Sequence, residues 1–271
     1  MKQLRRGYVD TSHGQQLHYR VAGDHRGAPL VLIHQSPSSG AMWEPILPEL
    51  AHRGYFAIAP DLIGHGASDG PEALPTLHEY ADGVWRVMDG LDVRRASLVG
   101  HHSGASIALV MATHQPRRVA ALALWGVPLM TAERELRLGG EGQPDWDHAE
   151  EWICKRWVGR RAASGTGWTP EIGRRALLEL LQAGPNSQWL HNAVARMPVE
   201  PYLPDVAQPT LTICGELDSL YAESETAATL LPNGRFEPMH GASLDVADQD
   251  GVGFVNLVDE FLLECGARSS R

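Results

Sequence analysis

A short segment at residues 98–106, LVGHHSGAS, constrains the fold of this chain more than any other. An apolar strand end runs into a helix through a turn flanked by Gly100 and Gly104. Such a turn brings the strand and helix backbones so close together that Cβ atoms do not fit, and it lifts one side chain above the sheet. Counted between the two glycines, the lifted side chain is His102, and Ser103 follows it. We therefore expect a sheet with a functional residue at this turn.

Strand and helix signals alternate along most of the chain, which is typical of a mostly parallel sheet with helices on both faces. Residues 30–34, LVLIH, and 119–126, VAALALWG, are apolar runs of the kind that is buried on both sides. Residues 7–23 contain two short alternating runs around a turn at residues 12–14, which predicts an antiparallel hairpin. The pattern therefore favours an α/β fold.

The alternation stops near residue 130. Residues 130–204 contain helical stretches without a convincing strand, and five tryptophans lie there: Trp146, Trp152, Trp157, Trp168 and Trp189. A strand pattern returns at residues 209–218, PTLTICGELD. We therefore expect an α/β core at 1–129 and 205–271, with residues 130–204 inserted between two strands as a helical cap, or lid.

The composition excludes several classes of function. The chain has 271 residues and a formal net charge of −10, which argues against binding to nucleic acids or anionic membranes. No apolar run approaches the roughly 18 residues of a membrane span. The basic N-terminal segment lacks the apolar run of a secretory signal, and three widely spaced cysteines form no metal or redox pattern. We expect a cytoplasmic protein of unknown oligomeric state whose partner is a small-molecule substrate.

Five segments in order along the chain resemble those of the α/β-hydrolases. They are HQSPSSGAMW (34–43), APDLIGHGASDGP (59–71), LVGHHSGAS (98–106), GELD (215–218) and MHG (239–241). The first resembles the oxyanion loop of that family and the second its Pro-Asp-x-x-Gly-x-Gly-x-Ser loop, while the last two resemble its acid and histidine loops. The resemblance implies the α/β-hydrolase fold: a mostly parallel, eight-stranded sheet with helices on both faces and a helical cap.

The resemblance also implies a catalytic acid, Asp218, and a general base, His240. A carboxylate at the tip of GELD can accept a hydrogen bond from a histidine and stabilise the imidazolium formed during the reaction. Glu216 is a neighbouring carboxylate, but the family pattern places the acid two residues later. A histidine titrates close to neutral pH, so His240 can take a proton and return it.

The tip of the turn departs from the family pattern, which has Ser, Cys or Asp where this chain has His102. Three interpretations stay open. In the first, Ser103 is the nucleophile. In the second, a His240–Asp218 dyad activates water or deprotonates the substrate, with His102 as a second polar group. In the third, the site binds a ligand without turnover.

The expected oxyanion loop departs from the family pattern too, because Gln35 and Ser36 follow His34 where a glycine is usual. A backbone N–H of Gln35 or Ser36, together with that of Ser103, is expected to hold an oxyanion. Trp125, beside a sheet-edge loop, is expected to line the substrate pocket. The histidines lack a ligand-spaced acidic or cysteine set, so we expect no metal site and no cofactor.

These patterns predict a cofactor-free enzyme of the α/β-hydrolase type. It is expected to hydrolyse an ester, lactone or related acyl bond of a small apolar or aromatic substrate. The alternative is a lyase or a cofactor-independent oxygenase that uses the His240–Asp218 dyad without a covalent serine intermediate. A non-catalytic, ligand-binding relative is the third possibility.

Overall fold

The computed structural model describes residues 4–11, 14–130 and 146–268. Its strands are β1 (Arg5–Asp10), β2 (Gln16–Ala22), β3 (Ala28–Ile33), β4 (Tyr55–Pro60), β5 (Ala96–His101), β6 (Val119–Trp125), β7 (Thr210–Gly215) and β8 (Gly234–Met239). They form one eight-stranded sheet in the order β1-β2-β4-β3-β5-β6-β7-β8. The pairs β1–β2 and β2–β4 are antiparallel and the other neighbouring pairs are parallel. The expected hairpin and the mostly parallel, eight-stranded sheet are confirmed.

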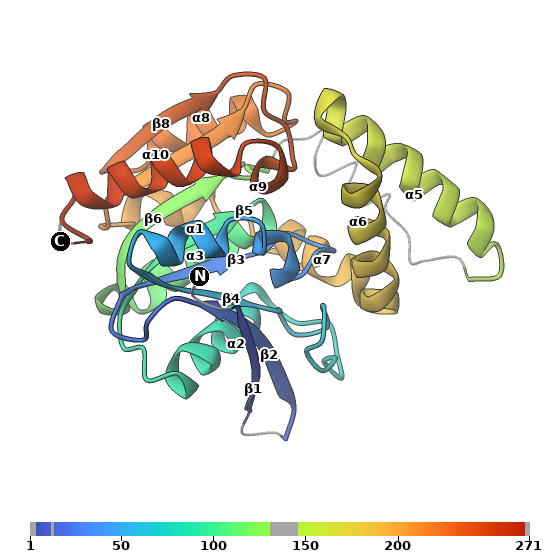
Figure 1. The fold of residues 1–271 in the computed structure, drawn as a ribbon, viewed down its shortest axis with the longest axis horizontal. Helices are drawn as coiled ribbons and strands as arrows, with labels where there is room; N and C mark the ends of the chain where they lie inside the picture. The colour runs from blue at the N-terminus through green and yellow to red at the C-terminus, as the bar shows by residue number, and fades with distance from the viewer. Residues whose placement is uncertain (1–3, 12–13, 131–145, 269–271) are drawn as a thin grey trace.

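Helices cover both faces of this sheet (Figure 1). The helices are α1 (Leu47–His52), α2 (Leu77–Gly90), α3 (Ser103–His114), α5 (Ala149–Ser164), α6 (Pro170–Ala183), α7 (Trp189–Arg196), α8 (Tyr221–Leu230), α9 (Val246–Gln249) and α10 (Gly251–Glu264). Short 3-10 helices include η1 (Gly40–Trp43) and η5 (Glu200–Asp205). Helices α1 and α10 cover one face, and α2, α3 and α8 cover the other.

The core consists of two apolar layers, one on each face of the sheet. Strand β3 contributes to both, because successive strand residues point to opposite faces. Val31 and Ile33 pack in the layer with α2 and α3, whereas Leu30 and Leu32 pack in the layer with α1 and α10. This double burial explains the continuous apolar run at residues 30–34, and it fixes the strand ends from which the functional loops start.

Side chains cap the starts of some of the helices, among them α2 and α6. The Thr76 hydroxyl accepts a hydrogen bond from the Glu79 N–H (3.2 Å), and the Glu79 carboxylate accepts one from the Thr76 N–H (2.7 Å). This reciprocal capping box defines the first turn of α2. At the start of α6 the Thr169 hydroxyl accepts a hydrogen bond from the Ile172 N–H (3.3 Å), and Pro170 occupies the first helical position.

The described residues between β6 and β7 form helices. In Figure 1, α5 and α6 stand away from the sheet, whereas α7 lies closer to it. Leu190 of α7 and Leu203 of η5 pack in the same apolar layer as α2 and α3. The division into a core at 1–129 and 205–271 and a cap at 130–204 stays a prediction. In the described ranges, no helix has the length and apolarity needed to cross a membrane.

The turn between β5 and α3 needs both of its glycines. A Cβ atom on Gly104 would lie 2.3 Å from the Ile33 carbonyl oxygen, and one on Gly100 would lie 2.6 Å from the Ala105 Cα. Both neighbours are backbone atoms, which cannot rotate away. The structure therefore agrees with the sequence argument that this turn leaves no space for Cβ atoms.

We predict that Gly104→Ala lowers the free energy of unfolding by about 1–3 kcal/mol, because the new methyl group overlaps the β3 backbone. Urea titration followed by circular dichroism measures the change. Gly159→Ala is the matched control: a Cβ at this position in α5 meets no atom within 4 Å. This control should raise the stability by about 0.5–1 kcal/mol through helix propensity. Equal effects of the two substitutions would contradict the steric argument.

Candidate active site

His102 lies at the tip of the turn between β5 and α3, with φ 49° and ψ −114°. A positive φ is unusual outside glycine, and such strained backbone costs about 1–3 kcal/mol. The His102 N–H donates to the Trp125 carbonyl (2.8 Å), and the His102 carbonyl accepts from the Ala105 N–H (2.8 Å). Backbone hydrogen bonds thus hold the strained turn, and the His102 side chain lines a cavity.

The His102 ring pairs with Asp218, which lies in the loop after β7. Nε2 of His102 is 2.9 Å from Oδ2 of Asp218, whose side chain is only 1% exposed. Burial favours a raised pKa for Asp218, but the nearby His102 and the hydrogen bonds from its ring and from the Leu220 N–H hold this pKa well below its usual range. Because a carboxylate only accepts hydrogen bonds, the shared proton lies on Nε2 and the ring lone pair on Nδ1.

Trp125 does not line the cavity, and that expectation is wrong. The side chain is the last of β6, is fully buried, and packs in the apolar layer of α1 and α10. Its indole N–H donates to Oδ2 of Asp218 (3.0 Å), while the Leu220 N–H donates to Oδ1 (3.0 Å). Trp125 therefore positions the Asp218 carboxylate from within the apolar core, and it does not line the cavity.

Gly126 leaves space for the His102 ring. A Cβ on Gly126, which has φ +64°, would lie 2.4 Å from Cδ2 and 2.6 Å from Nε2 of His102. The ring therefore occupies the space directly above the chain that leaves β6.

His101 also packs against the His102 ring, with 4.6 Å between the ring centroids. Its Nε2 is 3.0 Å from the Leu244 carbonyl and therefore carries the proton that it donates there. Burial, with a contribution from His102, holds the pKa of His101 well below its usual range. His101 stays neutral at neutral pH, so it does not place a positive charge beside His102.

The structure does not bring His240 to Asp218. The His240 side chain is 83% exposed, and its Nδ1 lies 2.8 Å from Oε1 of Glu216. Neither of these two residues lines the cavity. The expected His240–Asp218 pair is thus replaced by two separate pairs, His102 with Asp218 in the cavity and His240 with Glu216 at the surface.

A different residue of the loop after β8 reaches the cavity. Leu244 lines it, four positions beyond His240. A leucine side chain transfers no proton. Where the resemblance predicts a base, this chain therefore presents a hydrocarbon surface to the cavity.

Ser103 begins α3 and lines the cavity, but within the described ranges its hydroxyl makes no hydrogen bond to a basic side chain. Its Oγ accepts a hydrogen bond from the Ser36 N–H at 2.9 Å. A serine nucleophile needs a neighbouring base that takes its proton. The structure brings Ser103 close to the expected oxyanion loop and does not bring it to His240.

Gln35, Ser36 and Ser103 line the cavity together with His102, and each carries a backbone N–H group. The Ser36 N–H is engaged by Ser103, but two other donors remain. The Ser103 N–H belongs to the first turn of α3, where N–H groups have no partner within the helix. The Gln35 N–H makes no hydrogen bond within the described residues. Gln35 and Ser103 therefore supply the free backbone donors of this region.

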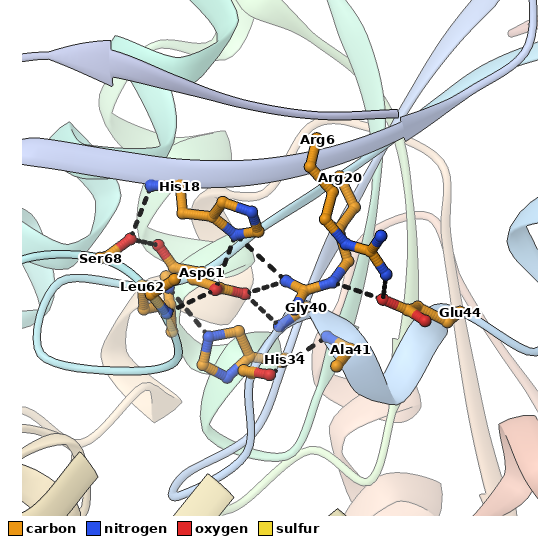
Figure 2. A network of polar contacts seen from close by, with 12 residues as sticks. Arg6, His18, Arg20, His34, Gly40, Ala41, Glu44, Asp61, Leu62 and Ser68 are labelled. Atoms are coloured by element: carbon orange, nitrogen blue, oxygen red, sulfur yellow. Dashed lines mark hydrogen bonds and ion pairs between the residues drawn. The ribbon is translucent and has the colours of Figure 1, made fainter. Parts of the chain in front are cut away.

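A buried carboxylate, Asp61, supports the loop that carries Gln35 (Figure 2). It accepts hydrogen bonds from His18 Nδ1 (2.9 Å), Arg20 (2.6 Å) and the backbone N–H groups of Gly40 (2.8 Å) and Ala67 (2.9 Å). Burial opposes ionisation, but the hydrogen bonds from His18 and the Ala67 N–H and the charge of Arg20 lower the pKa of Asp61 to about 2. One ionised side chain thus ties the loop after β3 to the loop after β4.

His34 forms a second link between these two loops. Its Nε2 accepts a hydrogen bond from the Leu62 N–H (2.9 Å), and its Nδ1 donates to the Gln35 carbonyl (2.8 Å). Burial lowers the pKa of His34 to about 4, which keeps the ring neutral at pH 7. His34 therefore orients the Gln35 peptide without adding charge.

The cavity has a volume of about 710 Å³ and lies between the strand ends and the helices α5, α6 and α7. The lining contains the His102–Asp218 pair together with apolar and basic side chains. The lining residues that the sequence motifs did not place there include Trp152, Lys155, Arg156, Arg160, Leu177, Leu180, His191, Val194, Leu217 and Leu244. Seven α5 residues line the cavity, at positions 152, 155, 156, 157, 159, 160 and 163, and all except Trp157 have the spacing of one helix face.

Glu179 of α6 is buried next to the loop after β3. The Ser39 hydroxyl donates to its Oε1 at 2.8 Å. Burial raises the pKa of Glu179 to about 7, although Arg175 and the Ser39 hydrogen bond oppose the shift. This carboxyl therefore titrates near neutral pH in the folded protein.

Within the described ranges, no group of three or more His, Cys, Asp or Glu residues is arranged to hold a metal ion. The histidines near the cavity instead make the separate contacts given above.

Comparison with known proteins identifies the family. The family model described as alpha/beta hydrolase fold matches residues 28–237, which is more than half of the chain. The chain therefore belongs to the α/β-hydrolase fold family, and the resemblance inferred from the five segments is confirmed.

Individual relatives are similar over parts of the chain. An uncharacterized protein of Mycobacterium bovis is 37% identical over 114 residues, which cover 42% of this chain and 33% of that protein. A haloalkane dehalogenase of Psychrobacter cryohalolentis is 32% identical over 162 residues, 58% of this chain and 52% of the relative. The chain thus matches between a third and about half of the length of these relatives.

Solved structures match over nearly the whole chain. A hydrolase from Pseudomonas aeruginosa PA01 superposes with a TM-score of 0.79 and 25% identity, covering 96% of this chain and 98% of that one. This similarity confirms the fold and leaves the substrate open.

We predict that Gly126→Ala displaces the His102 ring and breaks its hydrogen bond with Asp218, because the new methyl group overlaps Cδ2 and Nε2. The measurement is the proton NMR resonance of the His102 ring N–H, assigned with His102→Gln. This resonance should be lost or shifted strongly.

Gly241→Ala is the matched control. Gly241 has a similar φ of +67°, but a Cβ there meets no atom within 4 Å. It should introduce comparable backbone strain and leave the His102 resonance in place. An unchanged resonance in Gly126→Ala would contradict the steric argument.

We predict that Glu179→Gln stabilises the protein more at pH 8 than at pH 5. Between the usual pKa near 4.5 and the raised value of about 7, the unfolded chain loses the Glu179 proton while the folded chain retains it. The free energy of unfolding therefore falls as the pH rises through this window. Above pH 7, the whole destabilisation caused by ionisation of the buried Glu179 is present. The shift corresponds to about 3 kcal/mol.

Urea titrations at the two pH values measure this difference. Glu171→Gln, at an exposed position of the same helix, is the control. A Glu179→Gln effect that does not vary with pH, beyond the variation seen for Glu171→Gln, would contradict the prediction.

Proposed function

We propose that this chain hydrolyses an ester, lactone or related acyl bond of a small, largely apolar substrate, with water activated by His102. The observation that carries the proposal is the His102–Asp218 hydrogen bond at the cavity surface. A histidine held by a buried carboxylate in a cavity is an arrangement suited to general-base catalysis.

The proposed reaction begins with a water molecule beside Nδ1 of His102. The ring takes a proton from this water as its oxygen attacks the acyl carbon, and the imidazolium is stabilised by Asp218. The ring then returns the proton to the leaving group as the carbon–oxygen bond breaks. The products are a carboxylic acid and an alcohol, so a covalent enzyme intermediate is not required.

The oxyanion formed during the attack needs hydrogen-bond donors that are already in place. The N–H groups of Ser103 and Gln35 are the proposed donors. The Ser36 N–H, an alternative donor from the sequence argument, is engaged by the Ser103 hydroxyl. In this proposal Ser103 contributes its backbone and supports the loop with its side chain.

The contacts of Ser103 and His240 argue against the two other catalytic interpretations. Ser103 Oγ receives a hydrogen bond from a backbone N–H, and His240 pairs with Glu216 at the surface. A serine nucleophile activated by His240 would require both side chains to leave these partners. A His240–Asp218 dyad would require His240 to replace His102.

The same His102–Asp218 dyad could instead take a proton from a carbon acid, as in a lyase. We favour hydrolysis because the haloalkane dehalogenase and the Pseudomonas aeruginosa hydrolase, to which this chain is similar, carry names of hydrolytic enzymes. The apolar lining supports a small apolar substrate, and the proposed cap at 130–204 would cover it.

We predict that His102→Gln lowers kcat/KM for p-nitrophenyl acetate or p-nitrophenyl butyrate by about 100-fold or more, because the general base is lost. Asp218→Asn should lower it by a similar factor, because the amide no longer fixes the ring tautomer. His240→Gln is the matched control, the same substitution at an exposed histidine, and should change kcat/KM by less than about threefold.

Three outcomes would contradict the proposal. Loss of activity in His240→Gln with retention in His102→Gln would restore His240 as the base. A fluorophosphonate adduct on Ser103, found by peptide mass spectrometry and absent in Ser103→Ala, would restore the serine nucleophile. Absence of turnover with aryl esters and lactones would exclude acyl hydrolysis and favour the lyase or the ligand-binding protein.

A further inference from the structure

The Ser103 hydroxyl carries a proton that none of the described residues accepts. Its oxygen accepts a hydrogen bond from the Ser36 N–H at 2.9 Å. A serine hydroxyl has one proton to donate in addition to the lone pairs with which it accepts. Within the described ranges, Ser103 Oγ donates this proton to no other protein atom. Half of the hydrogen-bonding capacity of this side chain is therefore unused.

The burial of Ser103 makes the unused proton significant. The residue is only 3% exposed, and buried polar groups nearly always find hydrogen-bond partners. Ser103 lines the cavity together with its neighbour in the chain, His102. A molecule bound in the cavity is therefore the natural source of the missing acceptor.

The loop after β3 holds the Ser103 hydroxyl in place. Ser36 Oγ donates to the Ser187 carbonyl (3.0 Å), and His34 Nδ1 donates to the Gln35 carbonyl (2.8 Å). These contacts orient the Ser36 N–H, which in turn holds the Ser103 oxygen. Accepting this hydrogen bond also makes the hydroxyl a better donor, because hydrogen bonds in a chain polarise one another.

A serine hydroxyl can act in two ways at an acyl carbon. As a nucleophile it must lose its proton to a base, and Ser103 makes no hydrogen bond to a basic side chain in the part of the chain that the structure describes. As a hydrogen-bond donor it keeps the proton and requires only an acceptor on which negative charge develops. The contacts of Ser103 fit the second role.

We propose that the Ser103 hydroxyl donates a hydrogen bond to the oxyanion that forms when water attacks the acyl carbon. The nitrogen and the hydroxyl oxygen of one serine are close enough for both to bind the same oxygen atom, so the hydroxyl acts beside the Ser103 N–H. The Ser36 N–H then supports the oxyanion through this hydroxyl. The inference rests on the proposed acyl hydrolysis, and it makes Ser103 a catalytic residue that forms no covalent bond.

The first test measures steady-state kinetics with p-nitrophenyl butyrate. Ser103→Ala removes the hydroxyl donor and should lower kcat by about 30- to 300-fold, because the full negative charge on oxygen develops only after binding. The KM value should change by less than about threefold. A change confined to KM, or a kcat within about threefold of the wild-type value, would overturn the inference.

Ser106→Ala is the matched control. Ser106 lies in the same helix, α3, is fully buried and does not line the cavity. Its hydroxyl has no hydrogen-bond partner among the described residues, so its removal should leave kcat within about twofold of the wild-type value. Equal losses of kcat in the two variants would assign the effect to the packing of α3 and overturn the inference.

The second test measures binding without turnover by isothermal titration calorimetry. Phenyl butylphosphonate is a tetrahedral monoanion that resembles the intermediate, and N-phenylbutyramide is a neutral probe with a planar carbonyl group. Ser103→Ala should weaken binding of the phosphonate by about tenfold or more and binding of the amide by less than about threefold. Equal weakening for both probes, unchanged binding of the phosphonate, or no binding of the phosphonate to the wild-type protein would overturn the inference.

The outcomes separate this inference from the proposed function. If Ser103→Ala selectively weakens phosphonate binding but the wild-type protein hydrolyses no aryl ester or lactone, acyl hydrolysis fails and the donor role toward a tetrahedral anion stands. If Ser103→Ala hydrolyses p-nitrophenyl butyrate with the wild-type kcat, the donor role fails and acyl hydrolysis stands. A fluorophosphonate adduct on Ser103 would make the hydroxyl a nucleophile and overturn both.

Discussion

A buried carboxylate must be surrounded by hydrogen-bond donors, and this requirement organises the site around Asp218. The donors come from the ends of separate elements: His102 follows β5, Trp125 ends β6, and Leu220 lies beyond β7. Adjacent parallel strands place these ends at one edge of the sheet. The position of the His102 ring is therefore set by the sheet itself, and the ring nitrogen that faces away from Asp218 acquires its basic lone pair as a result.

The order of motifs along the chain was sufficient to predict the sheet, the turn at residues 98–106 and the loop that carries the acid. It was not sufficient to choose the histidine that pairs with the acid. His240 matches its motif by position in the sequence, yet it turns to Glu216, and Leu244 reaches the cavity instead. The path of the loop after β8 depends on tertiary contacts, such as the hydrogen bond of Leu244 to His101, which have no signature in the sequence. The assignment of Trp125 failed similarly, because a residue at a strand end can point to either face.

The loop after β3, beside His102 and Asp218, is held by buried side chains of which some are charged and others neutral at the same pH. Asp61 stays charged because four donors surround it, whereas His34 stays neutral because burial disfavours its cation. Glu179 is also buried but accepts a hydrogen bond from one hydroxyl group, and its pKa of about 7 lies between these extremes. The loop after β3 is therefore fixed by Asp61 and His34 at all moderate pH values, and its contact with α6 is the part that responds to pH.

The interactions that hold the strained turn at position 102 do not involve the side chain that lies at its tip. The hydrogen bonds to Trp125 and Ala105 are made by backbone atoms, and the close packing involves the two flanking glycines. None of these interactions depends on the side chain at the tip. A fold of this kind can exchange its reactive group without rebuilding the turn, provided that the opposite wall changes with it. In this chain the tip carries an imidazole paired with Asp218, and the loop after β8 lines the cavity with Leu244, so the proposed function takes its proton-transferring group from the turn after β5 instead of the loop after β8.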